Sequence, residues 1–209
     1  MPPKKQVYQF KITLQDIKPP IWRRIQVPST YSFWDLHVAI QDAMGWLDYH
    51  LHEFHIKDIG GKKLFIGIPS EDDDFIADFC EPHVVLPGWK QKVSKLISLA
   101  EPTFLYVYDF GDDWHHTVKL EKVLPAEDGI SYPRCIGGKR SSPPEDCGGP
   151  SGYQNMLEVL DDPEDDEYES TREWADSMKD GLFDPEKFKT SEVMFDDPKE
   201  RFKIAFQDE

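Results

Sequence analysis

Two histidines at alternate positions, followed later by carboxylates around a turn, are the residues best suited to chemistry. His50 and His52 are separated by one residue, and Asp109, Asp112 and His116 follow in a segment typical of a β-hairpin. On an extended strand alternate side chains share a face, so His50 and His52 are predicted to point the same way. Imidazole nitrogens and carboxylate oxygens are common ligands of divalent metals. His50, His52 and Asp109 are therefore candidate metal ligands, and all five residues are the candidate site of a metal-dependent hydrolase.

The same residues also fit a purely structural interpretation. By strand alternation His116 shares a face with Trp114 and is predicted to point inward, as are His50 and His52, whereas His115 points outward. An inward imidazole needs hydrogen-bond partners, because an unpaired buried polar group costs about 1–3 kcal/mol. Carboxylates near the strand ends could serve as partners in a buried network. No cofactor is predicted from these residues, and a divalent metal stays an alternative to the network.

A loop rich in glycine and proline is the most unusual stretch of the chain. It covers residues 133–153 and contains two pairs of adjacent glycines and one pair of adjacent prolines. Glycine pairs allow close backbone approach, and prolines stiffen the chain. Lys139 and Arg140 are expected to form ion pairs with Glu145 and Asp146 inside the loop, or to bind an anion. Long loops in compact domains are often functional, so this loop is a candidate binding element.

The leading functional hypothesis combines the loop with the hairpin. Residues 104–123 and 133–153 would form a recognition surface for an unidentified protein or small molecule. Trp114, Glu145 and Asp146 join the candidate site on this hypothesis. The chain has no recognisable nucleophile motif and no complete metal-ligand set, so whether it is an enzyme is left open.

The elements that would position these residues belong to an α+β fold. Alternating polar and apolar residues predict strands, and helical spacing of apolar residues predicts helices. The expected strands cover residues 7–15, 21–27, 50–56, 64–68, 103–110 and 114–123, and the expected helices cover 33–44, 153–160 and 171–179, with a short helix within 90–100. The first five elements follow the strand-strand-helix-strand-strand order of a β-grasp-like unit.

The prediction is therefore a mainly antiparallel sheet with a central helix, a structureless loop over residues 125–152, and C-terminal helices. We expect a single domain over residues 1–209, with residues 5–70 and 71–209 as candidate sub-units. The helix over residues 33–44 has the clearest boundaries. Ser32 and Asp35 match a capping box, and Gly45 is placed to end the helix.

The net charge of the chain argues against one class of function, the binding of nucleic acids. The chain has 209 residues, with 24 Lys and Arg against 40 Asp and Glu, and a formal net charge of −16. Residues 1–30 carry +5 and residues 141–209 carry −14. DNA phosphates are contacted chiefly by clustered Lys and Arg, so this balance argues against a nucleic-acid partner.

The cysteines and the hydropathy of the sequence predict the cellular compartment of the protein. Cys80, Cys135 and Cys147 lack zinc-site spacing and are expected as free thiols, with a bridge between Cys135 and Cys147 as the alternative. No apolar run approaches the roughly 20 residues of a membrane span, and no signal-peptide core is present. We expect a soluble cytoplasmic protein without membrane contact, and the sequence leaves its oligomeric state open.

Three ordered motifs resemble a known family. They are Met44-Gly45-Trp46 followed by His50-Leu51-His52-Glu53-Phe54, then Tyr108-Asp109-Phe110-Gly111-Asp112-Asp113-Trp114, then Pro143-Pro144-Glu145-Asp146 with Gly148-Gly149 and Gly152-Tyr153. In these motifs the chain resembles the plasmid pRiA-type ORF-three-like family, from about residue 5 to the C-terminal helices. The resemblance implies an α+β domain of uncharacterised biochemical role, found on plasmids and chromosomes and associated with mobile elements.

Some members of that family carry a transposon-passenger or resolvase label. A serine recombinase needs a nucleophilic serine near its first strand and a basic DNA-binding module. The first expected strand, residues 7–15, contains no serine, and the acidic residues 141–209 would repel DNA. The sequence therefore argues against resolvase activity.

Overall fold

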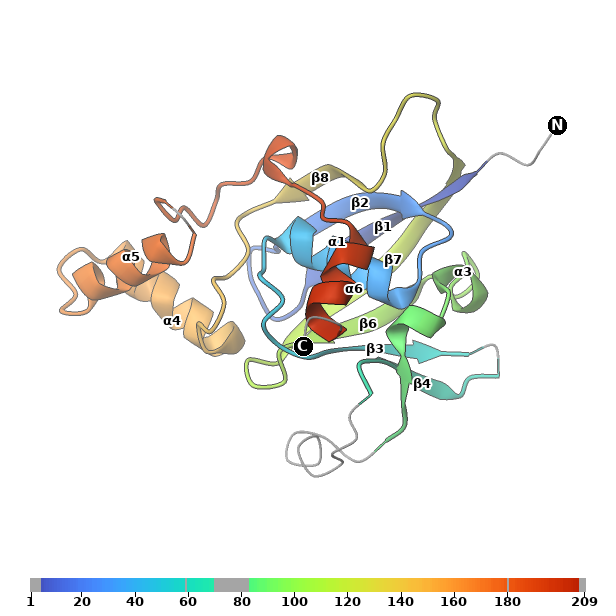
Figure 1. Cartoon of the computed structure of the whole chain (residues 1–209). Helices are drawn as coiled ribbons and strands as arrows, with labels where there is room; N and C mark the ends of the chain where they lie inside the picture. The colour runs from blue at the N-terminus through green and yellow to red at the C-terminus, as the bar shows by residue number, and fades with distance from the viewer. Residues whose placement is uncertain (1–4, 59, 70–82, 180, 207–209) are drawn as a thin grey trace.

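The fold is built on one eight-stranded sheet, which packs around a central helix (Figure 1). The computed structural model describes residues 5–58, 60–69, 83–179 and 181–206. Cys80, one of the three predicted free thiols, lies outside the described residues.

Eight strands form the sheet, which is antiparallel except at one edge. They are β1 (Gln6–Leu14), β2 (Trp22–Pro28), β3 (His52–Lys57), β4 (Lys63–Gly67), β5 (Val85–Pro87), β6 (Thr103–Tyr108), β7 (Trp114–Pro125) and β8 (Arg134–Lys139). Their order across the sheet is β5-β4-β3-β6-β7-β1-β2-β8. The short β5 runs parallel to β4, and the other neighbouring strands pair antiparallel. This confirms the predicted α+β fold with a mainly antiparallel sheet.

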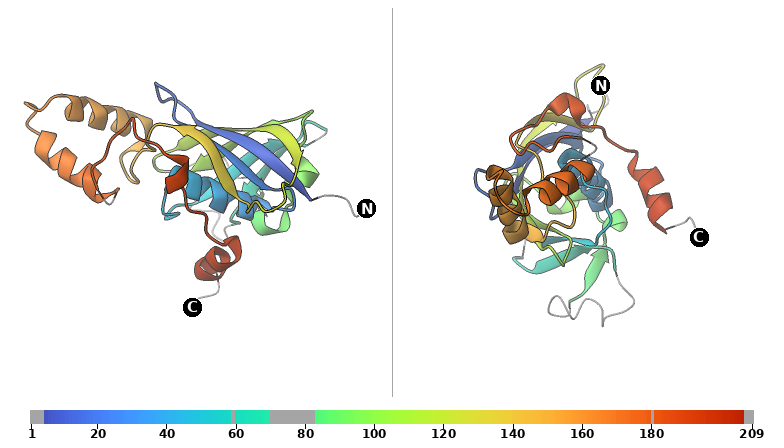
Figure 2. Two further views of the ribbon diagram at one scale, coloured as in Figure 1. Left: turned by 90° about the horizontal axis from the view of Figure 1, so that it is seen from above. Right: turned by 90° about the vertical axis from the view of Figure 1, so that its left-hand side faces the viewer.

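The helices lie on one face of the sheet and at one end of it. They are α1 (Phe33–Met44), α3 (Val93–Leu96), α4 (Gly149–Asp161), α5 (Tyr168–Ser177) and α6 (Pro198–Phe206), with 3-10 turns η1 (Gly88–Lys90) and η2 (Thr190–Glu192). The sheet curves around α1, and α6 lies across α1 on the side away from the sheet (Figures 1 and 2). α4 and α5 project together beyond one end of the sheet (Figure 2). No helix among the described residues is long and apolar enough to cross a membrane.

The central helix forms as its sequence predicts. The Ser32 side chain accepts a hydrogen bond from the Asp35 backbone, and the Asp35 carboxylate accepts one from the Ser32 backbone. Gly45 ends the helix in the left-handed conformation, with φ of 73°. The apolar stripe of α1 then packs into the core, where the Phe33 ring meets the edge of Phe54 at a centroid distance of 5.1 Å.

The hairpin of β6 and β7 lies in the middle of the sheet. It separates β1 and β2 from β3 and β4, which come earlier in the sequence. β6 pairs with β3 and places Tyr108 opposite His52, while β7 pairs with β1 and places His116 opposite Leu14. The β6–β7 turn therefore lies at the same end of the sheet as the chain that enters β3.

Residues 134–139 were predicted to be part of a structureless loop, and this prediction is wrong. They form β8, which pairs with β2 at an edge of the sheet. Glycines in this strand obscure the alternation by which strands are recognised. Packing requires a glycine at position 138, where a Cβ would collide with the Phe188 ring, whereas a Cβ on Gly137 would be in ordinary contact with the Trp22 ring. The irregular stretch is therefore divided into residues 126–133 and residues 140–148, and we use 'the loop' below for residues 140–148.

Three further elements differ from prediction. α4 begins at Gly149 rather than at residue 153, with a proline in its first turn, where a missing N–H costs little. α6 and β5 were not expected. Both elements are short, which leaves few residues from which to recognise them. In addition, α6 has no buried residue, so its sequence lacks the strong apolar periodicity by which a helix is predicted.

Candidate functional site

Three regions of the chain meet at one end of the sheet. They are the segment that joins α1 to β3 (residues 45–51), the β6–β7 turn (residues 109–113) and the loop (residues 140–148). The backbone N–H of Leu47 donates to Oε1 of Glu145 at 2.8 Å and so ties the segment to the loop. Residues distant in sequence are thereby brought side by side.

His50, Asp109 and Asp146 converge at this meeting point, and we call them the open cluster. Nε2 of His50 lies 3.0 Å from Oδ1 of Asp146 and 3.6 Å from Oδ2 of Asp109. One ligand atom from each residue lies within 4.8 Å of the other two. The His50 Nε2 atom is shielded from solvent yet has no hydrogen bond of acceptable geometry, although Asp146 is close. One imidazole and two carboxylates so placed can hold a divalent cation.

The turn holds Asp109 in position for this contact. Oδ1 of Asp109 accepts hydrogen bonds from the backbone N–H groups of Gly111 at 2.9 Å and Asp112 at 3.3 Å. These bonds fix the carboxylate and leave Oδ2 facing His50. Asp112 does not join the cluster. Its carboxylate instead accepts a hydrogen bond from the Gly148 backbone at 3.2 Å, which fastens the turn to the loop.

Glu145 is buried next to the cluster and anchors the loop. Its carboxylate accepts hydrogen bonds from the Leu47 backbone at 2.8 Å and from the Tyr108 hydroxyl at 3.1 Å. Burial raises the pKa of Glu145, against the effect of these two hydrogen bonds. Asp146 follows it in the chain with a side chain that is 61% exposed. The buried glutamate therefore positions a neighbouring carboxylate that solutes can reach.

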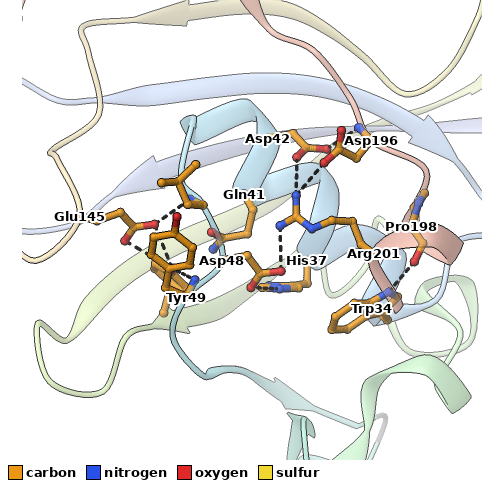
Figure 3. A network of polar contacts seen from close by, with 12 residues as sticks. Trp34, His37, Gln41, Asp42, Asp48, Tyr49, Glu145, Asp196, Pro198 and Arg201 are labelled. Carbon is orange, nitrogen blue, oxygen red and sulfur yellow. Dashed lines mark hydrogen bonds and ion pairs between the residues drawn. The ribbon is translucent and has the colours of Figure 1, made fainter. Parts of the chain in front are cut away.

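A second group, His37, Asp48 and His52, forms what we call the buried cluster. Figure 3 shows His37 and Asp48 of this group. The His37 ring is bound at both nitrogens, by the Tyr106 hydroxyl and by Oδ1 of Asp48, each at 2.8 Å. The His52 ring stacks on it with centroids 3.4 Å apart, and neither His52 nitrogen has a hydrogen-bond partner. Burial, aided by the neighbouring His37, lowers the pKa of His52 well below its usual range. His52 is therefore neutral at physiological pH.

Arg201 of α6 covers the buried cluster (Figure 3). Its guanidinium contacts carboxylate oxygens of Asp48 at 2.9 Å, Asp196 at 2.8 Å and Asp42 at 3.5 Å. Burial favours a raised pKa for Asp48, but its contacts with His37 and Arg201 outweigh burial and lower this pKa to about 2. The guanidinium of Arg201 therefore already provides the positive charge next to Asp48.

The five residues of the predicted hydrolase set do not form one site. His50 precedes β3 instead of lying on it, so the prediction that His50 and His52 share a strand face is wrong. His52 belongs to the buried cluster. His116 points inward as predicted, with Nδ1 near the carbonyl of Trp114 at 3.1 Å, and burial lowers its pKa to about 3. Trp114 is 1% exposed and belongs to the core, so it presents no docking surface.

The contacts predicted inside the loop are replaced by contacts to other regions. Arg140 pairs with Glu186 at 2.6 Å and donates to the carbonyl of Pro19 at 2.8 Å, and neither partner lies in the loop. Cys135 and Cys147 are free thiols, as the sequence predicted. The loop is therefore held by the rest of the molecule rather than by its own ion pairs.

Sequence reasoning missed two residues that the structure makes prominent. His37 lies among the apolar positions of α1, between Leu36 and Val38, and is 0% exposed. A titratable residue at a core position of a helix is the signal that could have identified it. Arg201 carried no such signal, because its three carboxylate partners are distant from it or unremarkable in sequence.

Comparison with known proteins agrees with the fold and the motifs. A relative, the uncharacterized protein y4hQ of Sinorhizobium fredii, is 37% identical over 175 residues, which cover 82% of this chain and 81% of that protein. The crystal structure of a protein of unknown function, MM3350 from Methanosarcina mazei, matches with a TM-score of 0.81 at 44% sequence identity, covering 92% of this chain and all of that one. The family model described as plasmid pRiA4b ORF-3-like protein matches residues 6–192. The chain therefore belongs to the plasmid pRiA4b ORF-3-like family.

Proposed function

We propose that this protein binds a divalent cation at the open cluster of His50, Asp109 and Asp146. The observation that carries the proposal is the His50 Nε2 atom, which is shielded from solvent, lacks a hydrogen bond and faces two carboxylate oxygens. A cation between these three atoms would be coordinated by the imidazole nitrogen and would offset the repulsion between the two carboxylates. A mixed nitrogen and oxygen ligand set suits Mn²⁺ or Zn²⁺ better than Ca²⁺, which takes oxygen ligands.

The proposal retains the hairpin and the loop as the binding elements of the chain. Asp109 begins the hairpin turn, and Asp146 lies in the loop. The aromatic side chains on the strands of the hairpin, Phe104, Tyr106, Tyr108 and Trp114, are buried and unavailable to a partner. Binding is therefore proposed to act through polar groups where the turn and the loop meet, and a small anionic molecule could complete the coordination of the cation.

The first experiment compares two matched variants. Metal-free protein is titrated with Mn²⁺ and with Zn²⁺ by isothermal calorimetry. We expect one cation per wild-type chain, and an affinity lower by about tenfold or more in Asp146→Asn, which replaces a charged ligand by a neutral one. Asp113→Asn is the control, because Asp113 lies in the same turn and contacts His115 rather than the cluster.

Both substitutions preserve the backbone, since Asp146 and Asp113 have φ of 55° and 56° and asparagine tolerates this conformation. A difference between the variants therefore reports the loss of a ligand. Equal affinities in the two variants would contradict the proposal, and so would a wild-type protein that binds neither cation saturably.

A metal-dependent hydrolase is the second candidate function. The exposure of Asp146 favours it, because catalytic metal sites have three protein ligands and keep a position open for water. Protein loaded with the cation should then hydrolyse an activated ester or phosphoester, and Asp146→Asn should lose that turnover. Cation binding without turnover in the wild type would leave a binding function and remove the hydrolase.

We also propose a cytoplasmic location without a nucleic-acid partner. The formal charge of −16 supports the second part, and the free thiols of Cys135 and Cys147 support the first. Cell fractionation tests the location. Affinity for duplex DNA that falls steeply with salt would contradict the absence of a nucleic-acid partner.

A further inference from the structure

Arg23 is a buried cation that pairs with neutral groups. The residue is 2% exposed. Its Nε donates to the carbonyl of Ala43 at 2.8 Å, Nη1 donates to the carbonyls of Trp22 at 3.0 Å and Lys139 at 3.1 Å, and Nη2 donates to the Ser142 hydroxyl at 2.9 Å. In the described part of the chain no carboxylate forms an ion pair with this guanidinium. One of its five N–H groups has no acceptor among these contacts.

The uncompensated charge of Arg23 is energetically costly. Burial lowers the pKa of Arg23 to about 10. A buried ion without a counter-ion is strongly destabilising, and a buried arginine ordinarily has a carboxylate beside it. The missing partner of this guanidinium is therefore a negative charge.

Lys179 is a second cation near the same place. It lines one cavity together with Arg23, and among the described residues its ammonium group has neither a hydrogen bond nor an ion pair. Burial lowers the pKa of Lys179 to about 8, although the charge of Glu145 acts in the opposite direction. Two cationic side chains, neither of which forms an ion pair among the described residues, thus line one cavity that is open to solvent.

The cavity has room for a small ligand. Its volume is about 210 Å³, and it lies between the end of α1, the start of the loop and residues 179–193. The Phe188 ring forms one wall and lies 3.8 Å from the central carbon of the Arg23 guanidinium. Of the acidic lining residues, Asp42 contacts Arg201 and Glu192 contacts Lys189, whereas Asp184 accepts the backbone N–H of Glu186 and has no ion pair among the described residues. Three lining cations, Arg23, Lys179 and Lys187, likewise form no ion pair in the described part of the chain and outnumber it. The lining therefore carries positive charge that is not neutralised.

We propose that this cavity binds a small oxyanion, a carboxylate or phosphate group, between Arg23 and Lys179. The free N–H of Arg23 and the ammonium of Lys179 would donate to its oxygens. The Ser142 hydroxyl is a third donor, because its proton meets the sulfur of Met44 at 3.8 Å, a weak acceptor. Charge-assisted hydrogen bonds of this kind are stronger than neutral ones. The proposal uses none of the residues of the open cluster and stands without the cation.

The test measures stabilisation of the intact protein by anions in the presence of EDTA. Wild-type protein is titrated with inorganic phosphate and, separately, with acetate, each against sodium chloride of equal ionic strength. We expect a saturable rise in the unfolding temperature with at least one of the two anions and none with chloride. The arm that responds identifies the oxyanion class, and calorimetry should give one anion per chain.

Lys179→Met removes one donor and one charge, and we expect it to weaken anion binding by about tenfold or more. Lys122→Met is the matched control, because Lys122 is an exposed residue of β7 away from the cavity and its loss changes the net charge equally. Each variant is compared with its own anion-free state, so a loss of stability alone does not imitate the result. The inference is overturned if neither anion stabilises the wild type, or if both variants respond alike.

Discussion

The aspartates of both clusters have a backbone conformation that most residues avoid. Asp48, Asp109 and Asp146 have φ of 61°, 58° and 55°. Aspartate and asparagine enter this left-handed region more readily than other residues, yet it still costs about 1–3 kcal/mol, and such residues concentrate at functional sites. This backbone strain occurs at the positions where an aspartate carboxylate must be oriented toward a histidine. Replacement by asparagine can therefore remove a charge at these positions without changing the backbone.

Asp48→Asn tests the electrostatics of the buried cluster. Burial favours a raised pKa for Asp48, but its contacts with His37 and Arg201 outweigh burial and lower the pKa from 3.8 to about 2. A carboxyl whose pKa is lower in the folded state stabilises the fold above pH 4, and that contribution is lost as the pH falls toward 2. We expect Asp48→Asn to lower the free energy of unfolding by about 1–2 kcal/mol at neutral pH, with a difference that shrinks between pH 4 and 2.

Urea denaturation at a series of pH values measures this difference between wild type and variant. Asp113→Asn is the control, because its carboxylate is exposed at 65% and contacts the half-exposed His115. We expect that variant to differ little from wild type at any pH. A destabilisation by Asp48→Asn that is constant from pH 7 to pH 2 would show that Asp48 does not act through its charge.

At the scale of the elements, α6 lies outside the part of the chain that matches the family model. It covers Pro198–Phe206, beyond the residues 6–192 that match the family model. Its contacts are specific. The Trp34 indole donates to the carbonyl of Pro198 at 2.8 Å, and the Phe202 and Trp34 rings pack edge to face with their centroids 5.7 Å apart. Arg201 adds the ion pairs to Asp48 and its neighbours. A helix without a buried residue thus depends on a few anchors.

Arg201→Met should release α6 and leave the sheet intact. The side chain is 18% exposed and holds three carboxylates, whose mutual repulsion is no longer offset once the cation is removed. We expect amide protons of α6 to exchange about tenfold faster or more, while β6 and β7 keep their protection. Hydrogen exchange read by mass spectrometry resolves the two regions.

Lys203→Met is the control for this helix, because Lys203 has the same charge but contacts only Glu200 on the exposed side among the described residues. Its removal should leave the exchange of α6 nearly unchanged. If the two variants accelerate exchange equally, the ion pairs of Arg201 do not hold the helix.

At the scale of the whole molecule, the position of the β6–β7 hairpin joins the two halves of the chain. Residues 5–70 supply β1 to β4, but β6 and β7 lie between these two hairpins in the sheet. Without them, β1 and β3 would each present an unpaired edge, and the core around α1 would lack Phe104 and Tyr106. The first part of the chain cannot form this sheet alone.

We therefore expect the full chain to unfold in one cooperative transition, followed by circular dichroism and tryptophan fluorescence with coincident midpoints. The fragment of residues 5–70 should show no cooperative transition. A fragment that melts cooperatively would instead establish residues 5–70 as an independent unit.

The local sequence determined most of the elements and the kinds of chemistry available, but not β5, β8 or α6. α1 was predictable to the residue, since Ser32, Asp35 and Gly45 act within a few positions of the helix ends. The β6–β7 hairpin was predictable for the same reason. The inward orientation of His52 and His116 followed from strand alternation, which holds wherever the residue truly lies on a strand.

Tertiary structure alone decided which of these residues meet. His50 precedes β3, so strand alternation does not predict the direction of its side chain. It faces Asp146 because the hydrogen bond between Leu47 and Glu145 holds the loop next to it. His52 stacks instead on His37 of α1, a residue that only packing of the helix on the sheet brings to it. Local patterns act over a few residues, whereas the convergence of side chains depends on strand order and loop path, which are set by burial across the whole sheet.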